Sequence, residues 1–319
     1  MSTVDLSKVE TLTKFFTYFQ NNLNHPVAVK PKEYLKSRNI NYELLEIGYN
    51  SGQFHHRGKL DEADTKACVD AGLLIPYKGS IPKATGATYT AFAKDCIIFP
   101  LKNQQNQIVS IYGRRITDET ENKHYYLKNR TGLYPGYPKQ ETTRLILTEA
   151  IIDTATLLQI QEITAEYELL SCYGTNGLTE EHKQAIKELQ KLEEIIFFFD
   201  GDKAGNEAIQ KYFKELSELL PNVKLTAVET PENEDVNSLS IAYDTEPAES
   251  GSRTPLKNRH KGEQIFTHLL ENRKDLFLLP EETEIKQEQG NITEVPPEPP
   301  RTQTKLNTKN RPEGAHEHH

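Results

Sequence analysis

The sequence predicts an α/β fold in which parallel strands alternate with helices. The clearest observation is the continuous apolar run at residues 195–199, which is long enough for a strand buried on both faces. Two further apolar runs, residues 144–149 and 168–173, are each followed by a turn signal and a helix-like pattern. Strands that alternate with helices in this way form a parallel sheet with right-handed crossovers.

The C-terminal half supplies the elements of this sheet in order. Four short apolar runs are expected as strands: residues 144–149, 168–173, 195–199 and 222–228. Helical patterns fill the intervals between them: residues 154–160, residues 179–192 and a stretch from residue 206 onward. Thr179 is a candidate N-cap for the second of these helices. The polar stretch 231–237 closes the unit.

Acidic residues follow two of the predicted strands. Asp200, Gly201 and Asp202 come directly after the run 195–199, and Glu149 ends the run that begins at residue 144. A buried parallel strand delivers its C-terminal residues to the ligand-binding edge of the sheet. Mg²⁺ prefers oxygen ligands and keeps several waters, so these few carboxylates suffice for a metal site. An isolated Asp-Gly-Asp is also typical of an ordinary acidic turn, with Asp202 capping the next helix.

The N-terminal half predicts a smaller α+β lobe. Residues 4–22 carry apolar side chains near helical spacing and are expected as one amphipathic helix packed on its neighbour. Further helices are expected at residues 32–39 and 60–74. A strand that ends near Pro100, a polar turn and a returning strand at 108–112 indicate a hairpin, and a β-rich run follows at 123–127.

Basic residues are concentrated in this lobe. Between residues 78 and 130 there are nine Lys and Arg against four Asp and Glu, whereas acids dominate elsewhere. A basic groove tracks a phosphate backbone with little sequence preference. Interleaved tyrosines are candidates for stacking on bases: Tyr112, Tyr125, Tyr126, Tyr134 and Tyr137. The alternative is a solvated face with tyrosines half buried in a sheet, and His124 and His182 are expected as surface or packing residues.

Composition limits the class of protein. A chain of 319 residues suggests two domains, and 36% hydrophobic residues with a mean hydropathy of -0.68 indicate a disordered part. No run of about 18 apolar residues occurs, so no membrane span is expected. Three separated cysteines and the absence of a signal pattern favour buried thiols in the cytoplasm. The net charge of -9 argues against a generic nucleic-acid coat.

The acidic half resembles the Toprim domain, which is shared by bacterial-type primases, topoisomerases and some nucleases. The resemblance lies in four segments: Glu149 to Asp153, Gly174-Thr-Asn-Gly177, Asp200-Gly-Asp202 and Asp235-Val-Asn237. The family often has glycine where this chain has Ala150, a small residue that does little damage to the pattern. The resemblance implies a Rossmann-like parallel sheet flanked by helices.

The N-terminal half is similar to the N-terminal lobe of the catalytic core of bacterial-type, DnaG-like DNA primases. The matching residues are Tyr34, Leu35, Arg38 and Ile40 at the opening, Ile97, Phe99 and Pro100 in the strand, and Gly113 and Arg114 after the hairpin. Together the two resemblances cover residues 31–240. Four segments are therefore expected: an N-terminal helix (1–30), a primase-like lobe (31–140), a Toprim domain (141–243), and a linker, short helix and disordered tail (244–319). The short helix within 264–279 either packs back on the Toprim domain or docks a partner such as a helicase.

The resemblance implies metal-assisted phosphoryl transfer that makes short RNA primers on a single-stranded DNA template from nucleoside triphosphates. Asp200 and Asp202 would hold Mg²⁺ or Mn²⁺, and Glu149 would hold one cation or act as a general base. Asp153 and Asp235 would support this metal shell. The residues expected to face the template or the incoming triphosphate are Lys94, Arg114, Arg115, Lys123 and Lys128.

Two departures from the primase pattern leave other functions open. The first 30 residues contain no cysteine for the zinc-binding module of many bacterial-type primases, and Cys96 stands where the pattern often has arginine. A compact primase-like protein of a mobile element or plasmid fits both facts. The alternatives are a Toprim metal-dependent nuclease and a noncatalytic DNA-binding adaptor in replication or mobilisation. A topoisomerase fits less well, because the chain is short and no tyrosine stands out as the nucleophile.

Overall fold

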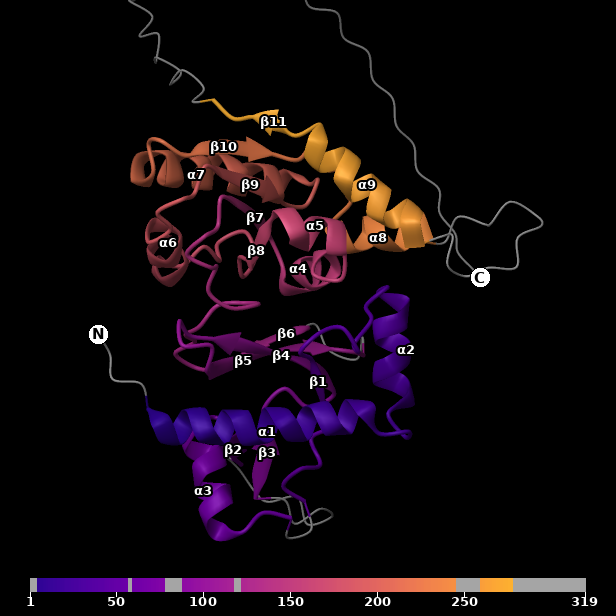
Figure 1. The fold of residues 1–319 in the computed structure, drawn as a ribbon. Coiled ribbons are helices and arrows are strands. Elements are labelled where there is room, and N and C mark those ends of the chain that lie inside the picture. The colour runs from indigo at the N-terminus through magenta and orange to yellow at the C-terminus, as the bar shows by residue number, and fades with distance from the viewer. Residues whose placement is uncertain (1–4, 57–58, 78–87, 118–121, 245–258, 278–319) are drawn as a thin grey trace, which may run out of the picture. The chain divides into compact units, whose positions relative to one another are not determined.

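The computed structural model describes residues 5–56, 59–77, 88–117, 122–244 and 259–277. The chain divides into two compact units, Met1–Leu278 and Leu279–His319, and every described residue belongs to the first. Within the described part the strands form sheets of four, five and two strands (Figure 1). The tail expected to be disordered lies outside the described residues. None of the described helices is both long and apolar enough to cross a membrane.

Helix α1 (Leu6–Asn24) runs along one face of the four-stranded sheet (Figure 1). Asp5 caps the helix by accepting a hydrogen bond from the Lys8 amide, and a stripe that includes Phe15, Phe16 and Phe19 is buried. Gly48 allows the close approach of strand β1 (Gly48–Asn50), since a Cβ there would lie 2.7 Å from the Cβ of Phe19. The predicted amphipathic helix is therefore confirmed.

The four-stranded sheet has the order β1-β4-β5-β6 and is antiparallel throughout. Strands β4 (Cys96–Lys102) and β5 (Ile108–Arg115) form the predicted hairpin, and β6 (His124–Tyr126) pairs with β5. The other elements of this lobe are α2 (Val29–Ser37), α3 (Glu62–Asp70), β2 (Leu74–Pro76) and β3 (Tyr89–Ala91). The helix expected over 60–74 is too long, because Gly72 takes a φ of +82° and the chain after it enters β2.

The five-stranded sheet has the order β11-β10-β9-β7-β8. Strands β7 (Arg144–Thr148), β8 (Glu168–Ser171), β9 (Glu194–Phe198) and β10 (Lys224–Ala227) are mutually parallel, whereas β11 (Lys274–Asp275) is antiparallel to β10. Every residue of β9 is buried, as expected for a strand covered on both faces. The predicted α/β class with a parallel sheet is confirmed.

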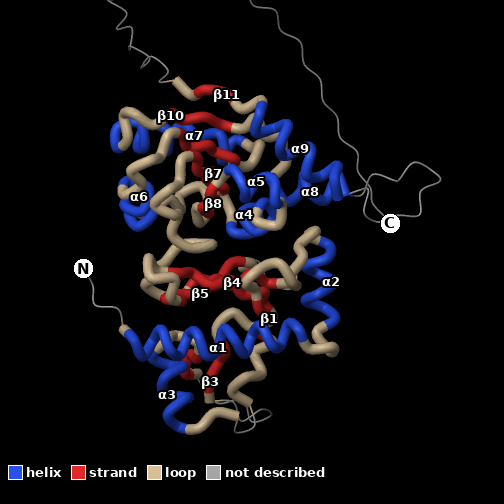
Figure 2. The backbone as a smooth tube through the Cα atoms, viewed as in Figure 1, coloured by secondary structure: helices blue, strands red, loops and turns tan. Residues whose placement is uncertain are grey.

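Helices cover both faces of this sheet (Figure 2). One core cluster packs Leu145 and Phe197 against α6 (Glu180–Lys187) and α7 (Lys203–Leu219). The cluster on the other face packs Ile146 and Phe198 against four helices: α4 (Ile151–Leu157), α5 (Gln161–Glu166), α8 (Val236–Asp244) and α9 (Arg259–Glu271). This arrangement is the doubly covered parallel sheet that the sequence predicted.

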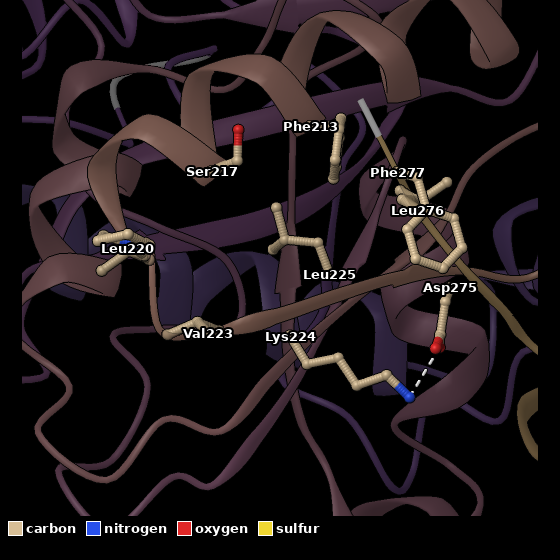
Figure 3. Close-up of a pocket in the computed structure, with 10 residues that line it drawn as sticks. Phe213, Ser217, Leu220, Val223, Lys224, Leu225, Asp275, Leu276 and Phe277 are labelled. Atoms are coloured by element: carbon tan, nitrogen blue, oxygen red, sulfur yellow. Dashed lines mark ion pairs between the residues drawn. The ribbon is translucent and has the colours of Figure 1, made fainter. Parts of the chain in front are cut away.

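The segment after the Toprim-like pattern returns to the five-stranded sheet. Phe266 and Leu270 of α9 are 1% and 2% exposed and pack in the core cluster with Phe198. Strand β11 then continues the sheet, with Lys224 and Asp275 joined by an ion pair of 2.7 Å (Figure 3). Two roles were expected for this helix, packing on the Toprim-like half or docking a partner. The structure shows it packed on the sheet.

A buried ion pair fastens this returning segment. Both nitrogens Nε and Nη2 of Arg273 donate to the carboxylate of Glu194 at 2.7 Å, and the Thr226 hydroxyl donates to the same carboxylate at 2.9 Å. Arg273→Met leaves the Glu194 charge, which is 6% exposed, without its cation. We expect a loss of about 3 kcal/mol in the free energy of unfolding, measured by urea denaturation.

Lys274→Met is the control for this substitution. The Nζ atom of Lys274 lies 3.8 Å from Glu229, and both side chains are more than 60% exposed. An exposed pair of this kind contributes about 0.5 kcal/mol or less. Equal effects of the two variants would show that the Arg273 pair does not fasten α9 and β11 to the sheet.

The three cysteines, Cys68, Cys96 and Cys172, are buried free thiols, as the sequence predicted. Burial raises the pKa of the Cys68 and Cys96 thiols to about 12, so both remain protonated and unreactive at neutral pH.

Candidate active site

A cleft of about 460 Å³ lies where the primase-like lobe meets the carboxyl ends of the parallel strands. The N-terminal lobe contributes cationic, imidazole and aromatic side chains to its lining, and the C-terminal half contributes the carboxylates together with Tyr173, Thr175 and Asn237. Its polar and aromatic lining residues are Arg38, Tyr112, Arg114, His124, Tyr126, Glu149, Asp153, Tyr173, Thr175, Asp200, Asp235 and Asn237.

The two lobes are joined beside this cleft. Asn237 is fully buried at the start of α8, and its Nδ2 donates to the carbonyl of Arg38 at 2.7 Å. Nη1 of Arg38 lies 3.4 Å from Oδ1 of the same asparagine. Asn39 donates to the Ser240 hydroxyl at 2.8 Å. These bonds place Arg38 in the cleft wall. From the sequence, Arg38 was recognised only as one residue of the primase-like pattern, with no role in a site.

The turn that contains Asp200 is tied to the loop before Asp235. The Gly201 amide donates to the carbonyl of Glu234 at 2.8 Å, and the Asn233 amide donates to the carbonyl of Gly201 at 3.1 Å. A Cβ on Gly201 would lie 2.0 Å from the carbonyl oxygen of Pro231, so only glycine fits between the two loops. The contact brings two acidic loops together at the carboxyl edge of the sheet.

Crowding of carboxylates is the main electrostatic feature of the cleft. Burial, followed by the charges of Asp200, Asp202 and Asp235, raises the pKa of Glu149 to about 7. Burial and the charges of Asp235 and Asp202 raise the pKa of Asp200 to about 6. The neighbouring carboxylates therefore disfavour ionisation of Glu149 and Asp200, which is the arrangement expected of a site that binds a cation.

Glu149 has an acceptor that the protein does not satisfy. Its Oε2 atom is buried and has no hydrogen-bond partner in the described part of the chain. No group of three His, Cys, Asp or Glu side chains among the described residues is already arranged around a common metal position. The unsatisfied Oε2 and the mutual repulsion of the carboxylates nevertheless fit a divalent cation, which takes hard oxygen ligands together with waters.

The remaining acids have additional structural roles. Oδ1 of Asp202 accepts from the Gly205 amide at 2.7 Å and caps α7, the role that the alternative interpretation of this turn assigned to it. Asp202 does not line the cleft, although its charge raises the pKa of Glu149 and Asp200. Oδ1 of Asp235 accepts from the Ser238 amide at the start of α8, and Asp235 does line the cleft.

Asp153 is buried at the first turn of α4. Its Oδ2 accepts from the Ala150 amide at 3.1 Å, and its Oδ1 accepts from the Asn237 amide at 3.3 Å. Burial and the nearby Asp235 and Asp200 raise its pKa well above the ordinary value. Asp153 therefore links the N-termini of two helices beneath the cleft.

The structure brings one of the five predicted basic residues into the cleft. Arg114 lines it, with Nε 3.4 Å from the Tyr34 hydroxyl and Nη1 bonded to Nε2 of His124. Arg115 instead bonds the Tyr125 hydroxyl at 2.8 and 3.0 Å. Lys94 pairs with Asp95 at 3.8 Å. Arg115, Lys94, Lys123 and Lys128 do not line the cleft.

Two of the tyrosines proposed to stack on bases are core residues. Tyr112 and Tyr134 are 2% and 3% exposed, so the stacking hypothesis is wrong for both. Tyr126 packs against Tyr173 across the two lobes, with ring centroids 5.6 Å apart. The guanidinium of Arg130 lies 4.3 Å from the first ring and 4.2 Å from the second. These aromatic contacts stiffen the cleft wall.

The two histidines behave differently. His182 is fully buried, and its Nε2 lies 2.9 Å from the carbonyl of Ser171, which confirms it as a packing residue. His124 lines the cleft, which the sequence reading missed. The pairing of Arg114 with His124 across β5 and β6 was the signal for it, but the sequence alone does not give the register of these two strands.

Comparison with known proteins agrees with this geometry. Residues 18–135 match the family model of the DNA primase catalytic core, N-terminal domain, and residues 146–240 match a Toprim-like model. A DNA primase of Pseudomonas aeruginosa is 29% identical over 246 residues, which are 70% of this chain and 34% of the relative. A DNA primase of Escherichia coli is 24% identical over 242 residues, covering 70% of this chain and 39% of the relative. The chain thus spans about a third of the length of these curated relatives.

Solved structures show the same fold. A DnaG primase catalytic domain bound to single-stranded DNA aligns with a TM-score of 0.61 and 19% identity, covering 85% of this chain and 80% of that one. A DNA primase domain from Pseudomonas aeruginosa aligns with a TM-score of 0.62 and 23% identity, covering 84% and 79%. With the two family models in consecutive order, the chain carries a DnaG-like primase core, in which the N-terminal domain of the catalytic core precedes a Toprim-like domain.

Proposed function

We propose that this chain makes short RNA primers on single-stranded DNA from nucleoside triphosphates by Mg²⁺- or Mn²⁺-dependent phosphoryl transfer. The observation that carries the proposal is a single cleft lined by Glu149, Asp200 and Asp235 together with Arg38 and Arg114. Carboxylates and guanidinium groups that line the same cleft suit a cation-bound triphosphate. The solved structure of a DnaG primase catalytic domain bound to single-stranded DNA supports the choice of template.

Of the four carboxylates that line the cleft, Glu149, Asp200 and Asp235 would hold the cation, because both oxygens of the fourth, Asp153, already accept backbone hydrogen bonds. A bound divalent cation supplies stabilisation of the charge that develops on the attacking and leaving oxygens. Asp202 and Asp153 act from outside this set: they hold the starts of α7 and α4, and the charge of Asp202 adds negative potential at Glu149 and Asp200. Alternatively, Glu149 would act as the general base that takes the proton of the attacking hydroxyl, since a pKa of about 7 in the metal-free cleft suits proton transfer.

The basic wall would bind and orient phosphate groups. Among the described ion pairs none includes Arg114, whose side-chain partners Tyr34, Tyr112 and His124 are all neutral. Its charge therefore remains available to a phosphate, for which the planar fork of arginine is well shaped. Lys94, Arg115, Lys123 and Lys128 lie outside the cleft and would contact the DNA backbone instead.

We further propose that the chain acts in the cytoplasm and serves a mobile element or plasmid, with a replicative helicase as a partner. The matches to the primase N-terminal model and the Toprim-like model support a role in DNA replication, within which this setting is proposed.

The experiment is primer synthesis on single-stranded DNA with labelled ribonucleotides and Mg²⁺ or Mn²⁺. Asp200→Asn keeps the shape of the side chain and removes its charge, so we expect synthesis to fall by about 100-fold or more. Asp202→Asn preserves a good helix cap and should lose less activity, because Asp202 does not line the cleft. Glu207→Gln, an exposed change on the same helix α7, is the control and should leave synthesis unchanged.

Each outcome has a distinct meaning. Short products that disappear in Asp200→Asn support metal-dependent primer synthesis. Bound but intact DNA without products would support a noncatalytic adaptor, and cut DNA would support a Toprim nuclease.

A further inference from the structure

The guanidinium of Arg114 is held in the cleft by neutral groups. Its Nη1 donates to Nε2 of His124, and its Nε donates to the Tyr34 hydroxyl at 3.4 Å. Arg114 and His124 are register partners on the adjacent strands β5 and β6, so both side chains project to the same face of the sheet. The contact therefore follows from strand pairing.

The hydrogen bonds define one tautomer of His124. Since Arg114 can only donate, Nε2 of the imidazole must be unprotonated and accept. The proton then lies on Nδ1, which is 2.9 Å from the hydroxyl of the buried Tyr112 and donates to it. Partial burial and the charges of Arg114 and Lys123 lower the pKa of His124 to about 4, in agreement with a neutral ring.

We propose that His124 is a positioning residue that, as the neutral Nδ1–H tautomer held by Tyr112, directs the Arg114 guanidinium to the triphosphate of an incoming nucleotide. The inference rests on the proposed function, because it assigns a phosphate ligand to Arg114. The inference adds His124 to the candidate site, whereas the sequence alone predicted only a surface or packing role for it.

A neutral acceptor has a specific advantage at this position. A carboxylate there would fix Arg114 equally well but would form an ion pair with it and compete with phosphate. Imidazole fixes the guanidinium and leaves its charge uncompensated. The carboxylates Glu149 and Asp200 line the same cleft, where the cation would face them.

Three substitutions at His124 separate positioning from packing. Gln presents an acceptor close to the place of Nε2, whereas Asn presents its polar atoms close to Nδ1 and cannot reach Arg114. Glu reaches Arg114 but brings the competing charge. We expect His124→Gln to keep the KM for ribonucleoside triphosphates within about twofold, and His124→Asn and His124→Glu each to raise it about tenfold with kcat much less affected.

Two measurements do not depend on primer synthesis. Nitrogen-15 NMR of the histidine-labelled chain should show an Nδ1–H tautomer for the signal that disappears in His124→Asn. Calorimetric titration with ATP and Mg²⁺ should show affinity reduced about tenfold by His124→Asn and by Arg114→Gln, with no further loss in the double variant. The exposed His25 provides the control, since His25→Gln should change none of these values.

The results distinguish failure of the proposed function from failure of the proposed role of His124. If the wild-type chain binds ATP with this coupling but makes no primers, the proposed function fails and the role of His124 stands. An Nε2–H tautomer, additive losses in the double variant, full affinity in His124→Glu or no ATP binding by the wild type would each overturn the inference.

Discussion

Gly201→Ala is expected to destabilise the protein by about 3 kcal/mol and to abolish primer synthesis. The new Cβ would lie 2.0 Å from the carbonyl oxygen of Pro231 and 2.7 Å from that of Thr230, and both of these atoms belong to the backbone. The chain has no flexible side chain there to move aside, so one of the two loops must shift. Because the Gly201 amide bonds Glu234, that shift separates Asp200 from Asp235.

Urea denaturation and primer synthesis measure the two effects separately. Gly136→Ala is the matched control, since the nearest atom to its new Cβ is the Lys102 side chain at 3.9 Å. It should be close to wild type in both measurements. An active and stable Gly201→Ala protein would show that the two acidic loops tolerate separation and that their contact does not set the site.

Much of the parallel sheet was predictable because burial on both faces leaves a simple signal. The run that became β9 is apolar at each position from Ile195 to Phe198, and such a run has few alternatives. Strand β11 carries no such signal: it consists of Lys274 and Asp275, both exposed. Its place beside β10 depends on the packing of α9 and on the Arg273 ion pair, which are tertiary contacts.

The site was predictable to the extent that it depends on strand ends. Glu149 and Asp200 follow β7 and β9, and parallel strands deliver both to one edge. The sequence could not distinguish a carboxylate that caps a helix from one that faces the cleft, and Asp202 and Asp200 differ in this respect. Arg38 and His124 were missed because the first depends on contact between lobes and the second on the register of β6.

Glu149→Gln is expected to abolish primer synthesis and, at the same time, to make the metal-free protein more stable at pH 8. The folded state raises the pKa of Glu149 from 4.5 to about 7, so it binds more protons than the unfolded chain between these values. The stabilising contribution is therefore fully present below pH 4.5 and is lost as the pH rises through 7. The pKa of Asp200 is raised from 3.8 to about 6, so its contribution to stability is also lost as the pH rises.

Removing the Glu149 charge removes the desolvation penalty of a buried carboxylate and the repulsion between Glu149 and Asp200. Allowing for solvent screening in the open cleft, we expect a gain of about 1–2 kcal/mol at pH 8 and little change at pH 4.5. Urea denaturation at the two pH values in the presence of a chelator measures the difference, with Glu207→Gln as the exposed control. Added Mg²⁺ should stabilise the wild type more than the variant, because it acts on the same repulsion.

Loss of stability in Glu149→Gln at pH 8 would mean that the carboxylate is stabilised by contacts within the protein, and the cleft would then have no excess negative charge for a cation to neutralise. A gain in stability combined with a loss of synthesis has the opposite meaning. The unsatisfied Oε2 of Glu149 and the crowded carboxylates are then a cost to the fold that persists because cation binding needs them.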